Sequence, residues 1–245
     1  MRPQFPEFIS GLKAVLPILI GVIPFGMIYG VLALDAGMLP VQAQAMSSIV
    51  FAGSSQFIAT QLIGGSVIGI VIVLTIVIVN LRHLLYSASI APYFKNLSKT
   101  KKVFLAYFLT DEAYAVAIAH FRSLDREQSH QKQAKNNSEH LIIRSKYKYY
   151  YYLGAGFGLW SIWQISTAAG IYLGAIIPES WSLDFTLALT LIALVVPTFE
   201  DRASLIAALV AGLISVFAFT MPYKIGLLVA AFVGITAGVF LKKRL

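Results

Sequence analysis

The chain has 245 residues, of which 58% are hydrophobic and only 12% are charged, whereas a soluble domain carries about 25% charged residues. Long apolar runs alternate with short charged patches, which predicts an all-α integral membrane protein, a polytopic helical bundle of seven or eight transmembrane segments with at least one broken or re-entrant helix. The lack of cysteine excludes disulfides and thiol chemistry. We attribute the net charge of +8 to basic cytoplasmic loops, which are usual in membrane proteins, rather than to nucleic-acid binding. No cofactor or metal site is expected.

Hydropathy predicts eight apolar segments, at residues 11–34, 43–63, 67–90, 103–120, 149–177, 183–199, 203–221 and 225–241. Residues 121–148 are polar and lack periodicity, so we expect an irregular cytoplasmic linker there. This linker divides the chain into an N-terminal membrane half at 1–120, which carries the motifs, and a C-terminal membrane half at 149–245.

Lysine and arginine are enriched on the cytoplasmic side of membrane proteins, and they gather in the linker and at residues 242–244. Four apolar segments separate these two regions, so both can be cytoplasmic. The lysines at 95–102 conflict with this arrangement if all eight segments span the membrane. A re-entrant fourth segment leaves seven spans and an external N-terminus, and a reporter fused to the N-terminus distinguishes the two topologies.

The first segment contains Pro24, followed by Phe25. Proline cannot donate a hydrogen bond to the carbonyl of Ile20, so we expect a kink that leaves an acceptor free. Pro24 and Phe25 are therefore candidates either for a structural kink or for a substrate site. Glycines spaced by four predict close helix packing, at Gly26/Gly30, Gly65/Gly69, Gly154/Gly158, Gly170/Gly174 and Gly234/Gly238.

The second segment is interrupted by the sequence FAGSSQF at 51–57. Such residues at mid-depth are tolerated where they are buried in protein or line a cavity. If the helix breaks at Gly53, the free N–H groups of the second half-helix suit a carboxylate. If the helix continues, Gln44, Ser48 and Ser55 fall on one stripe. The alternative to a site is a packing interface of small residues whose hydroxyls bond back to the backbone. We favour the site, and its candidate residues are Phe51, Gly53, Ser54, Ser55 and Gln56.

The third segment ends with Asn80, Arg82 and His83, and the fourth contains the adjacent acids Asp111 and Glu112. One Asp at the centre of a membrane helix costs about 3 kcal/mol, so the fourth segment cannot be a simple lipid-facing helix. Arg82 either snorkels to the interface or, like His83, pairs with one of the acids, which are candidates for proton coupling. Asn80 lies deeper and is expected to face a cavity.

Aromatic residues mark the start of the C-terminal half. The tyrosines at 149–152 directly follow the basic linker and are typical of a membrane interface. Trp160, Trp163 and Gln164 have helical spacing, and we expect aromatic packing there rather than a pocket.

On these residues the chain resembles the AzlC family of branched-chain amino acid permeases. The matching motifs are residues 21–26, Ser47, residues 51–57, residues 80–83 with Tyr86, and residues 110–112. The resemblance implies an exporter subunit in the bacterial cytoplasmic (inner) membrane. The implied substrates are apolar amino acids such as leucine, valine, isoleucine and methionine, and the implied partner is a small AzlD-type membrane subunit.

The predicted function is a proton-coupled secondary transporter, not an enzyme. The substrate carboxylate would lie near residues 53–56, and its ammonium near the kink at Pro24 or the acids of the fourth segment. Uptake is the alternative to export. A remote alternative is an intramembrane serine hydrolase with Ser54 or Ser55 as nucleophile and His83 as base.

Overall fold

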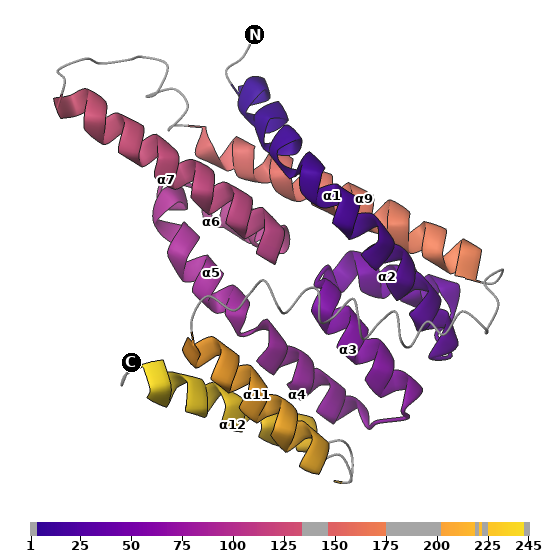
Figure 1. Ribbon diagram of the computed structural model, residues 1–245. Coiled ribbons are helices and arrows are strands. Elements are labelled where there is room, and N and C mark those ends of the chain that lie inside the picture. Colours follow the sequence, from indigo (N-terminus) through magenta and orange to yellow (C-terminus); the bar gives the residue numbers. More distant parts are fainter. Residues whose placement is uncertain (1–3, 134–146, 175–201, 219–220, 222–224, 243–245) are drawn as a thin grey trace.

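The computed structural model describes residues 4–133, 147–174, 202–218, 221 and 225–242 (Figure 1). Every regular element in these ranges is a helix, as the sequence predicts. The predicted apolar segment at 183–199 lies outside the described residues.

The two longest helices, α1 (Gln4–Asp35) and α9 (Lys148–Gly174), run side by side in the same direction (Figure 1). Glycines let their backbones touch. A Cβ added to Gly154 would lie 2.0 Å from the carbonyl oxygen of Phe8, and one added to Gly170 would lie 2.1 Å from another carbonyl oxygen of α1. The two halves of the chain therefore share one buried core.

Most of the glycines spaced by four serve helix packing, as predicted. Those that face a neighbouring helix are Gly26, Gly30, Gly154, Gly158, Gly170, Gly234 and Gly238. The last two belong to the antiparallel hairpin of α11 (Arg202–Phe217) and α12 (Ile225–Lys242). The prediction is wrong for Gly65 and Gly69. Gly65 directly follows the end of one helix, Gly69 is the first residue of the next, and a Cβ at Gly69 would have nothing within 4 Å.

The second apolar segment is broken, which is one of the two alternatives that the sequence left open. It forms α2 (Pro40–Val50) and α3 (Gly53–Gly64), which are separated by Phe51 and Ala52. The φ of Phe51 is 40°, in the left-handed region that bulky residues rarely adopt. The chain therefore changes direction before Gly53, which is the first residue of the second half-helix.

The third apolar segment forms α4 (Gly69–Asn80), α5 (Arg82–Ile90) and the short 3₁₀ helix η1 (Ala91–Phe94). Leu81, between α4 and α5, keeps helical backbone angles. The stretch from α4 to η1 and α1 are the two described helices that are long and apolar enough to cross a membrane, whereas α11 and most of α12 are apolar but shorter. The number of spans stays a prediction.

The fourth predicted segment, 103–120, is not one helix. It contains the end of α6 (Lys99–Tyr107) and the beginning of α7 (Asp111–Gln133). Asp111 and Glu112 thus lie in the first turn of a helix, where the helix dipole favours negative charge. The sequence left a continuous span and a re-entrant segment open here, and the break removes these carboxylates from the middle of a membrane helix.

Helix α7 also corrects the predicted linker. Residues 121–133 continue the helix past the expected boundary at residue 120, so the expectation of irregular structure is wrong for this part. Phe121 and Leu124 are almost fully buried, and Phe121 contacts aromatic rings of η1 and α9. These two buried side chains hold the start of the polar stretch against the bundle.

Candidate functional site

The breaks in the second and fourth segments face one cavity of about 350 Å³, with α1, α9 and the start of α5 as its other walls. The residues that line it are Ile18, Gly21, Val22, Phe25, Phe51, Ala52, Gly53, Ser54, Arg82, His83, Thr110, Asp111, Glu112, Leu159 and Trp163. Eight of these are among the site residues predicted from the sequence: Phe25, Phe51, Gly53, Ser54, Arg82, His83, Asp111 and Glu112.

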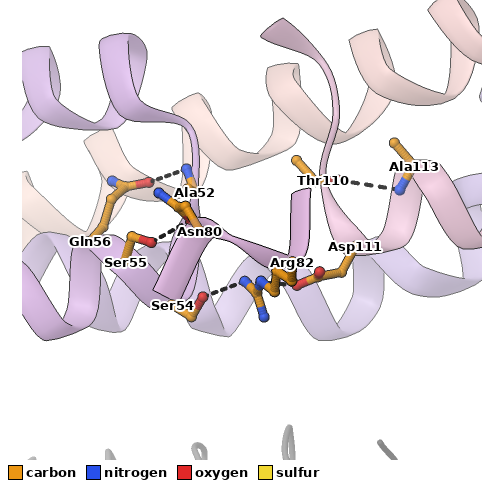
Figure 2. Close-up of polar contacts among 9 residues, drawn as sticks. All are labelled: Ala52, Ser54, Ser55, Gln56, Asn80, Arg82, Thr110, Asp111 and Ala113. Carbon is orange, nitrogen blue, oxygen red and sulfur yellow. Dashed lines mark hydrogen bonds and ion pairs between the residues drawn. The ribbon is translucent and has the colours of Figure 1, made fainter. Parts of the chain in front are cut away.

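An ion pair forms the polar end of the cavity. Arg82 Nη2 lies 3.0 Å from Asp111 Oδ2 and donates a hydrogen bond to Ser54 Oγ at 2.5 Å (Figure 2). These contacts join the first turns of α5, α7 and α3. Of the two interpretations of Arg82, the structure supports pairing with an acid over snorkelling to the interface.

Thr110 sets the start of α7. Its Oγ1 accepts a hydrogen bond from the N–H of Ala113 at 3.2 Å (Figure 2), which is the usual contact of an N-cap threonine. Because the helix starts here, Asp111 and Glu112 both lie at the cavity wall.

The polar end can bind charges of both signs. Helices α3 and α7 begin at it, and the first N–H groups of a helix lack intrahelical acceptors and carry positive partial charge. Arg82 Nε and Asp111 Oδ1 are buried and have no hydrogen-bond partner among the described residues. Buried polar atoms normally have such partners. The site therefore leaves one donor and one acceptor for a ligand that carries both charges.

Apolar side chains form most of the remaining wall. Phe25 packs edge-on against Phe57, with 5.8 Å between the ring centroids, and Phe51 lines the cavity at the helix break. Trp163 lies against the start of α3, since a Cβ added to Gly53 would be 3.1 Å from its ring. For Trp163 the sequence favoured aromatic packing over a pocket, but its side chain lines the cavity.

Four predicted site residues do not line the cavity: Pro24, Ser55, Gln56 and Asn80. Ser55 and Gln56 are fully buried. Ser55 Oγ donates to Asn80 Oδ1 at 2.7 Å, and Gln56 Oε1 accepts from the N–H of Ala52 at 3.2 Å (Figure 2). These hydrogen bonds therefore stabilise the helix break without contacting the cavity. Pro24 lies within α1, next to the lining residue Phe25.

The C-terminal carbonyls of α2 are bonded by two residues that the sequence analysis did not assign to the site. Gln164 Nε2 donates to Ser47 O at 3.2 Å, and the hydroxyl of Tyr107 donates to Ser48 O. Gln164 was expected only to pack. These contacts join residues that are far apart in the chain, so helical spacing within one segment could not reveal them.

The geometry argues against the hydrolase alternative. The hydroxyl of Ser54 accepts from Arg82, and that of Ser55 donates to Asn80. In the described part of the chain neither serine hydrogen-bonds to His83, whereas a serine nucleophile needs a base within hydrogen-bond reach.

We expect Gln56→Ala to lower transport about tenfold while the protein still reaches the membrane. The substitution leaves the buried N–H of Ala52 without its acceptor, at a cost of about 1–3 kcal/mol to the conformation that shapes the cavity. Gln61→Ala, at an exposed position of the same helix, is the matched control. Equal rates for both variants and the wild type in proteoliposomes would remove Gln56 from the site.

Comparison with known proteins identifies relatives of this chain. Residues 17–177 match the family described as "AzlC protein". The inner membrane protein YgaZ of Escherichia coli K12 is 30% identical over 234 residues, covering 91% of this chain and 86% of that protein. An uncharacterized membrane protein of Archaeoglobus fulgidus is 28% identical over 233 residues, covering 93% of this chain and 92% of that protein. The branched-chain amino acid transport protein AzlC of Bacillus subtilis is 28% identical over 109 residues, covering 44% of this chain and 42% of that protein. No solved structure matches.

Proposed function

This chain belongs to the AzlC family of transport proteins and is an inner membrane protein, and on that premise we propose that it is the large subunit of a secondary exporter of branched-chain or similar apolar amino acids. The name of the Bacillus subtilis relative supports the substrate class. A transport protein of this family is not expected to be an enzyme.

One observation carries the proposal: the cavity has a polar end with groups of both charges opposite an apolar wall. An apolar amino acid has the same division. Its carboxylate would lie at Ser54 and the first N–H groups of α3, where the helix dipole favours an anion. Its ammonium would bind Asp111, and its side chain would lie among Phe25, Phe51 and Trp163. The cavity volume, about 350 Å³, is at the small end of the range for small-molecule sites.

Within this proposal, Glu112 couples protons to transport and Asp111 binds the ammonium. Glu112 lines the cavity but is not the ion-pair partner of Arg82, so it can gain and lose a proton without breaking that pair. Carboxylates of this kind serve as proton relays in transporters.

We expect Glu112→Gln to keep leucine exchange but to lose stimulation by a pH gradient. The amide preserves the shape of the side chain and cannot carry the proton. The measurement compares labelled-leucine counterflow with leucine movement driven by an imposed pH gradient in the same proteoliposomes. A gradient response equal to that of the wild type would assign coupling to another group.

The proposed partner is a small AzlD-type membrane subunit, which rests on the family resemblance alone. Counterflow of labelled leucine, valine, isoleucine and methionine, with and without that subunit, tests the function. We expect exchange of these four amino acids and none of lysine or glutamate. If the protein instead accumulates these amino acids in the inward direction against their concentration gradient, this result would favour the uptake alternative.

A further inference from the structure

A second charged region lies apart from the transport cavity. Lys95, Lys99, Lys101 and Lys102 are all exposed, and residues 87–110 contain no acidic residue. Among the described residues, none of these four lysines forms an ion pair with a carboxylate. We call these four residues the lysine cluster.

The local structure holds the positive charges of the lysine cluster close together. Lys99, Lys101 and Lys102 lie at the start of α6, where the helix dipole is positive and cations are unfavourable. Lys102 Nζ donates to the carbonyl oxygen of Lys95 at 3.0 Å, which brings the two ends of the cluster together. A negatively charged group bound here would relieve the repulsion among these charges.

An apolar cavity of about 150 Å³ opens directly beside the lysine cluster. The residues that line it are Ser87, Ile90, Ala91, Phe94, Lys102, Leu105, Ala106, Leu109 and Tyr152. Lys102 is the one charged residue among them. Next to it, Val103 and Phe104 expose 74% and 55% of their surface, so the surroundings are suited to hydrocarbon rather than to water.

Aromatic residues indicate that this region lies at the membrane surface. Lys101 Nζ is 5.5 Å from the ring centroid of Tyr149, at the start of α9, where Tyr150 follows. Tyrosine is enriched where lipid headgroups meet hydrocarbon. Basic pockets between membrane helices at this depth suit anionic headgroups.

We propose that the lysine cluster and the adjacent cavity bind one anionic phospholipid, with its phosphate at the lysines and the upper part of an acyl chain in the cavity. The positive charges of the lysines match the negative phosphate, and the apolar walls of the cavity match an acyl chain. Inorganic phosphate has no acyl chain. The site shares no lining residue with the transport cavity, but Leu109 directly precedes Thr110, the N-cap of α7. The lipid therefore contacts the same turn that positions the acids of the transport site.

The test is native mass spectrometry of the full chain in detergent, titrated with dioleoyl phosphatidylglycerol or dioleoyl phosphatidylcholine. The mass of the adduct distinguishes a lipid from inorganic phosphate. We expect the wild type to retain one phosphatidylglycerol in preference to phosphatidylcholine. The quadruple variant Lys95→Gln, Lys99→Gln, Lys101→Gln, Lys102→Gln should bind phosphatidylglycerol at least about tenfold more weakly, since each lysine near an anionic lipid contributes about fivefold.

Two further variants separate a built site from general attraction. The quadruple variant Lys13→Gln, Arg122→Gln, Arg126→Gln, Arg202→Gln removes the same charge from exposed positions that do not line this cavity, and it should change phosphatidylglycerol binding less than about twofold. Ala106→Trp fills the cavity, keeps all four lysines and should also weaken binding. Equal losses in the two charge variants, unaltered binding by Ala106→Trp, or displacement of the lipid by inorganic phosphate would each overturn the proposal.

Discussion

Replacing Asp111 with asparagine is expected to reduce leucine counterflow by at least about tenfold, without preventing insertion of the protein into the membrane. The carboxylate pairs with Arg82 at 3.0 Å and has its second oxygen buried without a hydrogen-bond partner in the described structure. Losing a charge-assisted hydrogen bond to the substrate ammonium costs about 1.5–3 kcal/mol, or roughly tenfold to a hundredfold in binding. The pair is about one-third exposed, so its loss affects stability less than loss of a fully buried pair.

Asp125→Asn provides the matched control. Asp125 also forms an ion pair, with Lys148 Nζ at 2.6 Å, but it lies outside the cavity. Its substitution removes an ion pair by the same chemical change and should leave counterflow within about twofold of the wild type, as expected for a pair that binds no substrate. If both variants transport leucine like the wild type, Asp111 does not bind the ammonium.

Gly53→Val is expected to abolish most transport, because the valine side chain at the start of α3 would clash with the Trp163 ring. Even a single Cβ at this position would lie 3.1 Å from the indole ring, and valine adds two further methyl groups. Both residues line the cavity, so the ring can move only by entering the substrate space or by displacing the helix break. Overpacking of this kind typically costs 1–3 kcal/mol, and labelled-leucine counterflow measures its effect.

The steric explanation has its own test in the double variant Gly53→Val, Trp163→Phe. The smaller phenylalanine ring makes room, so this protein should regain part of the transport lost by Gly53→Val. Gly212→Val controls for the change from glycine to valine, because a Cβ at Gly212 has nothing within 4 Å. Failure of Trp163→Phe to restore any activity, with a correctly inserted protein, would show that the indole contact is not the cause.

Much of the site could be predicted because its residues are costly in lipid. Glycine, serine and glutamine inside an apolar run need burial or a cavity, and this reasoning located the break before Gly53. The acids of the fourth segment needed a partner for the same reason, and Arg82 is that partner. In both cases residue chemistry indicated the feature, but the structure was needed to choose a broken helix over a continuous one and pairing of Arg82 over snorkelling.

The other features of the site depend on single residues and on contacts between helices, which a hydropathy average does not report. The sequence allowed a re-entrant fourth segment but did not place the break between α6 and α7. A hydropathy window over 103–120 reports only the mean apolarity, although Thr110 followed by two acids is a signature of a helix start. Trp163 could not be assigned to the cavity, because its position depends on contacts with α3, about a hundred residues away in the chain.

The most direct test of the amino acid site is competition against labelled-leucine counterflow in proteoliposomes. The competitors are unlabelled leucine, 4-methylpentanoate, which lacks the amine, and 3-methylbutylamine, which lacks the carboxylate. If Asp111 binds the ammonium while Ser54 and the start of α3 bind the carboxylate, leucine competes strongly and each analogue competes at least about tenfold more weakly, since each lacks one charge-assisted contact. Competition by either analogue as strong as that of leucine would contradict a site that recognises both charges.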